Sequence, residues 1–169
     1  MKQKQNPYKP HVVVLPEDRA NEEIVNGFNN FLDLYSRAIQ IERPAGGWEN
    51  VVEKFQKNHV SEMEKFPERM MVLLMDFDEN YEYRFSYAKE RIPEYLENRV
   101  FVLGVLSEPE KLRTDIKKNF ENIGESLAKD CSDNTNELWG HALLKHNKNE
   151  LDRMIQYVKP FLFNKVNEE

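Results

Sequence analysis

The clearest chemical signal in the sequence is a pair of aspartates directly after its most apolar run. The run 70–75 (MMVLLM) is followed at once by Asp76 and Asp78. In an extended chain, residues two apart point to the same side and lie about 7 Å apart, so both carboxylates could reach one hard cation. Clustered carboxylates repel one another unless they are protonated or bound to a cation such as Mg²⁺ or Mn²⁺. The pair predicts a metal-dependent site or, since aspartate also suits turns and helix starts, a structural cap.

Further acidic residues follow two other apolar runs. Glu17 and Asp18 come after the run 11–15, and Glu108 and Glu110 come after the run 99–106. If these runs are parallel strands of one sheet, their carboxyl ends meet at the same edge, where α/β sheets bind ligands. We therefore expect Glu17 to lie close to the two aspartates.

The elements that must position these residues alternate along the chain. Runs rich in β-branched and large apolar residues predict strands, and apolar residues at steps of three and four predict helices between them. Helices that connect successive strands favour a parallel sheet with helices on both faces. The expected strands are 11–15, 37–41, 70–75 and 99–106, and the expected intervening helices are 20–36, 48–55 and 81–97.

The sequence predicts a single α/β domain. Its 169 residues suit one domain, and no linker or repeat divides them. We expect a core over about residues 11–110 and a helical C-terminal part over about 111–163, with breaks near Gly124 and in the polar stretch 130–134. Ser107 is expected to cap the helix that starts near Pro109.

Composition limits the classes of function. Hydrophobic residues make up 40% and charged residues 32%, and no stretch approaches the roughly 18 apolar residues of a membrane span. Cys131 is the only cysteine, so no intramolecular disulfide can form, and we expect a cytoplasmic protein with an inert thiol. The net charge of −6 argues against a simple phosphate-backbone binder unless metal ions intervene.

The order of the acidic motifs resembles the toprim fold, a metal-binding domain of topoisomerases, primases, small nucleases and the nuclease half of overcoming-lysogenization-defect proteins. The first motif is the run 12–17 (VVVLPE), which ends in Glu17, and the second is the run 72–78 (VLLMDFD). The sequence departs from the family pattern at Asp18, where a glycine commonly follows the glutamate, whereas Glu22 stands where nuclease members often carry another acid.

This resemblance implies a three-layer toprim/Rossmann-like fold and Mg²⁺- or Mn²⁺-dependent phosphodiester cleavage of DNA or RNA. It implies that Glu17, Asp76 and Asp78 are catalytic. The implied metal ligands are the same three residues with Glu108, and Glu110 is a possible helper at a second metal. The sequence has no phosphate-binding Gly-x-x-x-x-Gly-Lys-Ser/Thr loop, so nucleotide hydrolysis would need an ATPase partner. Assembly with such a partner and homo-oligomerisation both stay open, and no membrane contact is expected.

Three other interpretations stay open. In a receiver-like domain Asp76 would accept a phosphoryl group beside Glu17 and Asp18. In a haloacid-dehalogenase-like phosphatase Asp76 would be the nucleophile, Asp78 the acid and Ser107 a phosphate ligand. A non-catalytic interaction module would instead bind a larger partner through apolar residues of the C-terminal helices.

Overall fold

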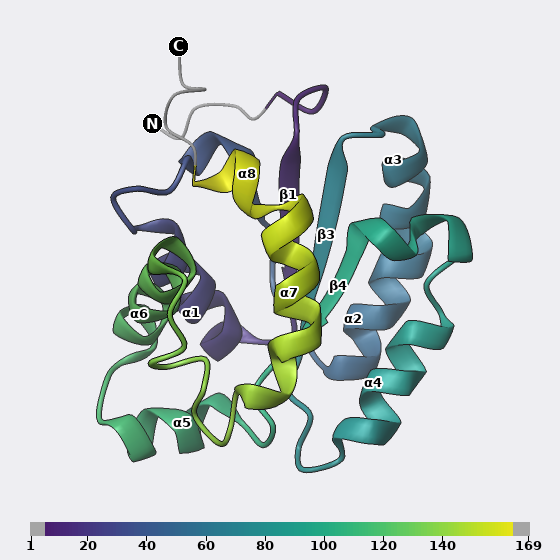
Figure 1. Cartoon of the computed structure of the whole chain (residues 1–169). Helices are drawn as coiled ribbons and strands as arrows, with labels where there is room; N and C mark the ends of the chain where they lie inside the picture. The colour runs from purple at the N-terminus through teal and green to yellow at the C-terminus, as the bar shows by residue number, and fades with distance from the viewer. Residues whose placement is uncertain (1–5, 164–169) are drawn as a thin grey trace.

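The protein is an α/β domain built on a four-stranded, all-parallel sheet, as the sequence predicts (Figure 1). The computed structural model describes residues 6–163. The strand order is β2-β1-β3-β4, so the first, third and fourth strands are neighbours. The strands are β1 (His11–Pro16), β2 (Ile39–Ile41), β3 (Arg69–Leu74) and β4 (Val100–Leu103).

The two central strands run side by side over their full length. β1 pairs with β3 through six residues, from His11 opposite Arg69 to Pro16 opposite Leu74. All six residues of β1 are buried, which explains why this strand is a continuous apolar run and does not alternate with polar residues. Because the two strands end together, the residues that follow them start at the same edge of the sheet.

Helices cover both faces of the sheet, and short 3₁₀ segments lead into β2, β4 and α7. The α-helices are α1 (Arg19–Asn29), α2 (Trp48–Lys54), α3 (Val60–Lys65), α4 (Tyr81–Glu90), α5 (Pro109–Ile116), α6 (Phe120–Asp133), α7 (Lys148–Tyr157) and α8 (Lys159–Leu162). The 3₁₀ segments are Ser36–Ala38, Glu94–Arg99 and Lys145–Asn147, and a π-helical turn, Phe55–His59, joins α2 to α3.

Each face of the sheet carries its own apolar cluster. Alternate strand residues such as Val13, Leu73 and Val102 pack against α2, α3 and α4. Their neighbours, such as Val14 and Phe101, pack against α1, α7 and α8. Figure 1 shows these two helical layers on either side of the strands. This alternation is the period-two side-chain pattern of a strand buried on both faces.

Several of the expected element boundaries are wrong, among them that of the last strand, which was expected over 99–106 and ends at Leu103. The first helix stops at Asn29 and does not reach 36, and the helix expected over 81–97 stops at Glu90, ahead of Pro93, which lacks the N–H that a helix interior needs. The helix α6 runs through Gly124 without a break. The N-cap of α5 is Glu108 and not Ser107.

Two glycines let α1 and α6 approach closely. A Cβ atom added at Gly27 of α1 would lie 1.9 Å from the carbonyl oxygen of Glu121, and one added at Gly124 of α6 would lie 1.8 Å from that of Ile24. These separations leave no room for any side chain. The helix α6 therefore fixes the position of α1, which begins at the carboxyl end of β1.

The exposed edge of β4 is closed by side chains. The backbone N–H of Val102 donates to Glu150 Oε2 at 2.8 Å, and that of Gly104 donates to Asn147 Oδ1 at 3.1 Å. Glu150 is 4% exposed and pairs with Lys89 at 3.0 Å and Arg153 at 2.8 Å. These contacts satisfy backbone groups that a fifth strand would otherwise pair.

Within residues 6–163, no helix combines the length and apolar character needed to cross a membrane.

Candidate functional site

The ends of β1 and β3 bring Glu17 and Asp76 together, as the sequence predicts. The backbone N–H of Glu17 donates to the carbonyl of Leu74 at 2.8 Å, which extends the β1–β3 ladder by one residue. The Glu17 carboxylate in turn accepts from the backbone N–H of Asp76 at 3.1 Å. The two acids are 59 positions apart in the chain, and the parallel pairing alone places them side by side.

Asp18 joins this pair because it starts α1. Its carboxylate caps the helix by accepting from the backbone N–H of Asn21 at 3.0 Å. Single oxygen atoms of Glu17, Asp18 and Asp76 all lie within 4.8 Å of one another. We call these three residues the acidic triad. The sequence placed Asp18 among the acids at the strand ends, but the toprim resemblance did not include it among the metal ligands.

Asn21 is a site residue that the sequence did not indicate. Its side-chain amide donates to Asp18 Oδ1 at 3.0 Å and to Asp76 Oδ1 at 2.9 Å, which bridges the two carboxylates. The residue is 1% exposed, and its Oδ1 has no hydrogen-bond partner among the described residues. A buried acceptor without a partner costs free energy. The only available signal was the Asp18-x-x-Asn21 spacing, which is typical of a helix start.

Burial and mutual repulsion raise the pKa values of Asp76 and Glu17. Burial raises the pKa of Asp76 to about 8, against an ordinary value of 3.8, and the charges of Glu17, Asp18 and Glu110 add to the increase. The Asn21 amide opposes it by stabilising the charged form. Burial likewise raises the pKa of Glu17, against the opposing hydrogen bond from the Asp76 backbone. At neutral pH the metal-free triad therefore holds a proton.

Asp78 does not share the direction of Asp76. The strand β3 ends at Leu74, and Asp78 has a left-handed backbone with φ 47°. The expected extended geometry is therefore wrong, and the Asp78 side chain is 72% exposed, 3.5 Å from Arg84. Its charge still contributes to the raised pKa of Glu17, so it lies at the rim of the triad.

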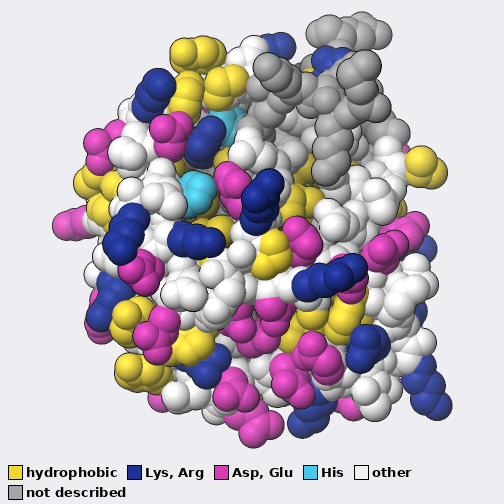
Figure 2. Space-filling model, turned by 180° about the vertical axis from the view of Figure 1, so that it is seen from behind, with side chains coloured by type: hydrophobic (Ala, Val, Ile, Leu, Met, Phe, Trp, Pro, Cys, Tyr) yellow, Lys and Arg dark blue, Asp and Glu magenta, His cyan; other side chains and the backbone are white. Residues whose placement is uncertain are grey.

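The acids after β4 are more distant. Glu108 and Glu110 are both exposed, at the N-cap and in the first turn of α5. Neither belongs to the triad, although the charge of Glu110 raises the pKa of Asp76. Ser107 is buried, and its hydroxyl has no hydrogen-bond partner among residues 6–163. Figure 2 shows acidic side chains gathered at the lower end of the molecule, where Figure 1 places the ends of the strands.

Arg84 of α4 is the second site residue that the sequence did not indicate. Its guanidinium donates to the backbone carbonyl of Asp76 at 2.9 Å and lies 4.8 Å from the ring centre of Trp48. Its side chain is 17% exposed. The contact with a carbonyl leaves the Asp76 carboxylate unneutralised. A lone arginine on a predicted helix gave no signal for this role.

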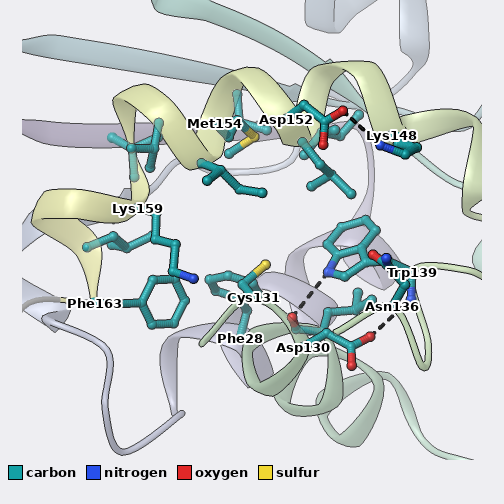
Figure 3. A pocket seen from close by; sticks show the side chains of 18 of the residues that line it. Phe28, Asp130, Cys131, Asn136, Trp139, Lys148, Asp152, Met154, Lys159 and Phe163 are labelled. Atoms are coloured by element: carbon teal, nitrogen blue, oxygen red, sulfur yellow. Dashed lines mark hydrogen bonds and ion pairs between the residues drawn. The ribbon is translucent and has the colours of Figure 1, made fainter. Parts of the chain in front are cut away.

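A separate cavity of about 370 Å³ lies on the face of the sheet that α1, α7 and α8 cover (Figure 3). It lies between α1 and α6 on one side and α7 and α8 on the other, and no member of the triad lines it. Cys131 faces this cavity, and burial raises the pKa of its thiol to about 11. A thiol with that pKa is protonated at neutral pH and is a poor nucleophile, as expected for an inert cysteine.

The chain matches no protein-family profile, no curated protein and no solved structure.

Proposed function

We propose that this protein is a divalent-metal-dependent phosphodiesterase that acts on nucleic acid, with Mg²⁺ or Mn²⁺ bound at the acidic triad. The observation that carries the proposal is the meeting of three carboxylates at the carboxyl edge of a parallel sheet, within 4.8 Å of one another. This edge is where α/β sheets bind ligands. Two members of the triad, Glu17 and Asp76, are among the metal ligands that the resemblance to toprim domains implies.

The charge balance of the triad supports a cation. Among the described residues, no lysine, arginine or histidine forms an ion pair with Glu17, Asp18 or Asp76. A buried carboxylate without a partner is costly and raises its own pKa, as Asp76 does. A hard divalent ion would remove that cost, because carboxylate oxygen is the ligand that Mg²⁺ prefers.

The unpartnered oxygen of Asn21 supports the same conclusion. It is a buried acceptor beside two of the three carboxylates. An ion with several bound waters offers donors to such an oxygen. The donor set therefore fits a hydrated Mg²⁺ or Mn²⁺. Glu17, Asp18 and Asp76 would hold the ion, and Asp78 lies at the rim of the triad.

The ion would supply positive charge that stabilises the negative charge developing on a phosphodiester in its transition state. The chain's own residues prepare the site for this. The Asp76 backbone holds the Glu17 carboxylate by a hydrogen bond, Asn21 orients the carboxylates of Asp18 and Asp76, and Arg84 fixes the Asp76 carbonyl. The buried hydroxyl of Ser107 has no partner among the described residues and could donate a hydrogen bond to a phosphate oxygen.

Cleavage assays on single- and double-stranded DNA and RNA with Mg²⁺ and Mn²⁺ test the proposal. Asp76→Asn and Glu17→Gln should abolish cleavage, and Asp78→Asn should reduce it less because that side chain faces solvent. Asp133→Asn is the control, because Asp133 is an exposed aspartate at the C-terminal end of α6. The assays are repeated with the products of neighbouring genes and across protein concentrations, so that an activity that requires an ATPase partner or a homo-oligomer is detected.

If no substrate is cut under any of these conditions, the nuclease proposal is wrong. If cleavage survives in both Asp76→Asn and Glu17→Gln, the chemistry lies elsewhere. A phosphatase with Asp76 as nucleophile is the second candidate, favoured by the unpartnered Ser107 hydroxyl. It predicts a phosphorylated Asp76 after incubation with a small phosphoester, which mass spectrometry would detect.

A further inference from the structure

Three aromatic side chains form a surface group beside the triad. Trp48 starts α2, and Tyr83 and Tyr87 lie one turn apart on α4. The ring centres of Trp48 and Tyr83 are 6.0 Å apart, those of Trp48 and Tyr87 are 5.0 Å apart, and the two tyrosines are 6.2 Å apart. We call these three residues the aromatic strip. In Figure 2, hydrophobic side chains are exposed at the lower left, the region to which α4 of Figure 1 turns.

Core packing does not explain every member of the strip. Trp48 and Tyr87 are half-buried and pack against the apolar cluster beneath α4. Tyr83 is 57% exposed and belongs to none of the three apolar clusters of the described residues. Its described ring contacts are with the other two members of the strip. Tyr83 therefore offers an exposed aromatic surface outside the packed core.

The strip is attached to the triad by two short connections. The backbone N–H groups of Gly46 and Gly47, directly before Trp48, donate to the carbonyl of Glu17 at 2.8 and 3.4 Å. The guanidinium of Arg84 joins the Asp76 carbonyl, at 2.9 Å, to the Trp48 ring, at 4.8 Å. A molecule that touches the strip is thus held next to the acids.

Arginines alternate with the rings of the strip. Arg84 lies over Trp48, and the guanidinium of Arg91 lies 3.4 Å from the ring centre of Tyr87. The whole chain has a net charge of −6 and would repel a polyanion. These two guanidiniums place positive charge against the rings, although Arg84 also lies 3.5 Å from the Asp78 carboxylate. Rings with adjacent cations are the pattern by which proteins bind single strands.

We infer that the aromatic strip binds unpaired nucleobases of a single-stranded nucleic acid, with Tyr83 as the outer stacking surface. The inference rests on the proposed function and specifies its substrate as single-stranded. In a duplex the faces of the bases are covered by their neighbours, whereas in a single strand they are free to stack on a side chain. Loss of one such stack weakens binding by between about 5-fold and about 150-fold.

The test measures binding separately from cleavage. Fluorescence anisotropy follows labelled oligonucleotides of about 20 nucleotides, single-stranded DNA, single-stranded RNA and the matched duplex, with EDTA present so that nothing is cut. Tyr83→Ala should weaken binding of the single strand at least about 5-fold and leave the duplex unchanged. Tyr83→Phe keeps the ring and should bind like the parent. The DNA and RNA arms identify which strand the site prefers.

Tyr95→Ala is the matched control, because Tyr95 is a 65% exposed tyrosine that hydrogen-bonds to Glu64. If Tyr83→Ala binds the single strand like the parent, or loses single strand and duplex equally, the inference is wrong. A parent that binds no nucleic acid at all also refutes it. Cleavage by the parent combined with an unchanged Tyr83→Ala rejects the strip and leaves the proposed function standing. Binding that depends on Tyr83, without cleavage under any metal, rejects the nuclease instead.

Discussion

Replacing Asp76 by asparagine should stabilise the metal-free protein, and the gain should increase with pH. Asp76 is 8% exposed, and burial raises its pKa to about 8. Between the unfolded value near 4 and the folded value near 8, the folded protein holds a proton that the unfolded chain has lost. Stability that is present at low pH is therefore lost as the pH rises through this window. An asparagine cannot ionise, so the variant escapes this loss.

The size of the effect follows from the pKa. Each pH unit over which the folded state holds one extra proton changes the unfolding free energy by about 1.4 kcal/mol. From about pH 5 to about pH 9 the variant should gain about 4 kcal/mol on the parent if the folded pKa is 8, and about 1 kcal/mol if burial raises it only half as far. The new side chain keeps the acceptor that Asn21 contacts at 2.9 Å, so the bridge between helix and strand should survive.

Urea unfolding in EDTA, followed by circular dichroism at several pH values, measures this difference. The exposed Asp133→Asn is the control and should follow the parent at every pH. A difference between Asp76→Asn and the parent that stays constant across the pH range would refute the reasoning. So would a parent that becomes the more stable of the two as the pH rises in EDTA.

Four further predictions concern the metal and the packing. Mg²⁺ at a hundredfold excess over Kd should raise the unfolding free energy of the parent by about 2.7 kcal/mol in thermal melts, and Asp76→Ala should abolish the gain. The Mg²⁺ affinity measured by calorimetry should increase about tenfold for each unit by which the pH is raised, up to about pH 8, because Asp76 must release its proton before it can ligate. Glu150→Gln should cost about 3 kcal/mol in urea unfolding, since Lys89 and Arg153 lose their buried carboxylate partner. Gly124→Ala should cost about 2 kcal/mol or more in the same assay and also weaken Mg²⁺ binding, because it forces α6 away from the helix that carries Asn21.

Each of these has a distinct contrary result. An Mg²⁺ response that persists in Asp76→Ala places the ion elsewhere, and a pH-independent Mg²⁺ affinity means that Asp76 is already ionised. A stable Glu150→Gln would mean that water replaces the lost charge at β4. Unchanged stability in Gly124→Ala would show that the helices can separate at no cost.

The sequence predicted the sheet because strand signals in this chain are local. The runs 11–15 and 70–75 are continuous and apolar, which requires burial on both faces and hence helices on both sides. The ends of the helices were less predictable. Phe31 and Tyr35 continue the spacing of α1, yet the helix stops at Asn29 and these rings reach the core from a loop. Periodicity records which residues are buried, and a loop held by tertiary contacts can bury the same residues.

The contacts of the candidate site were also predictable only in part. Glu17 and Asp76 were predicted to meet because parallel pairing alone brings them together. The direction of Asp78 depends on the backbone bond from its N–H to the carbonyl of Ser107, at 3.0 Å, in the loop after another strand. Asn21 reaches Asp76 only because α1 packs where α6 holds it. Such contacts between segments distant in sequence leave no pattern in either segment.

The closure of the β4 edge by Asn147 and Glu150 has a consequence for synthesis of the chain on the ribosome. The strands, including β4, are complete at Leu103, more than forty residues before the side chains that cover their open edge. Until those residues have left the ribosome, the nascent chain presents unpaired backbone groups on an apolar strand, the kind of surface that pairs with other chains. A ribosome that stalls between residues 103 and 147 would therefore hold an aggregation-prone chain with an unpaired strand edge. Chains truncated before residue 147 should aggregate, and binding to a chaperone such as a ribosome-associated holdase should be strongest over this interval.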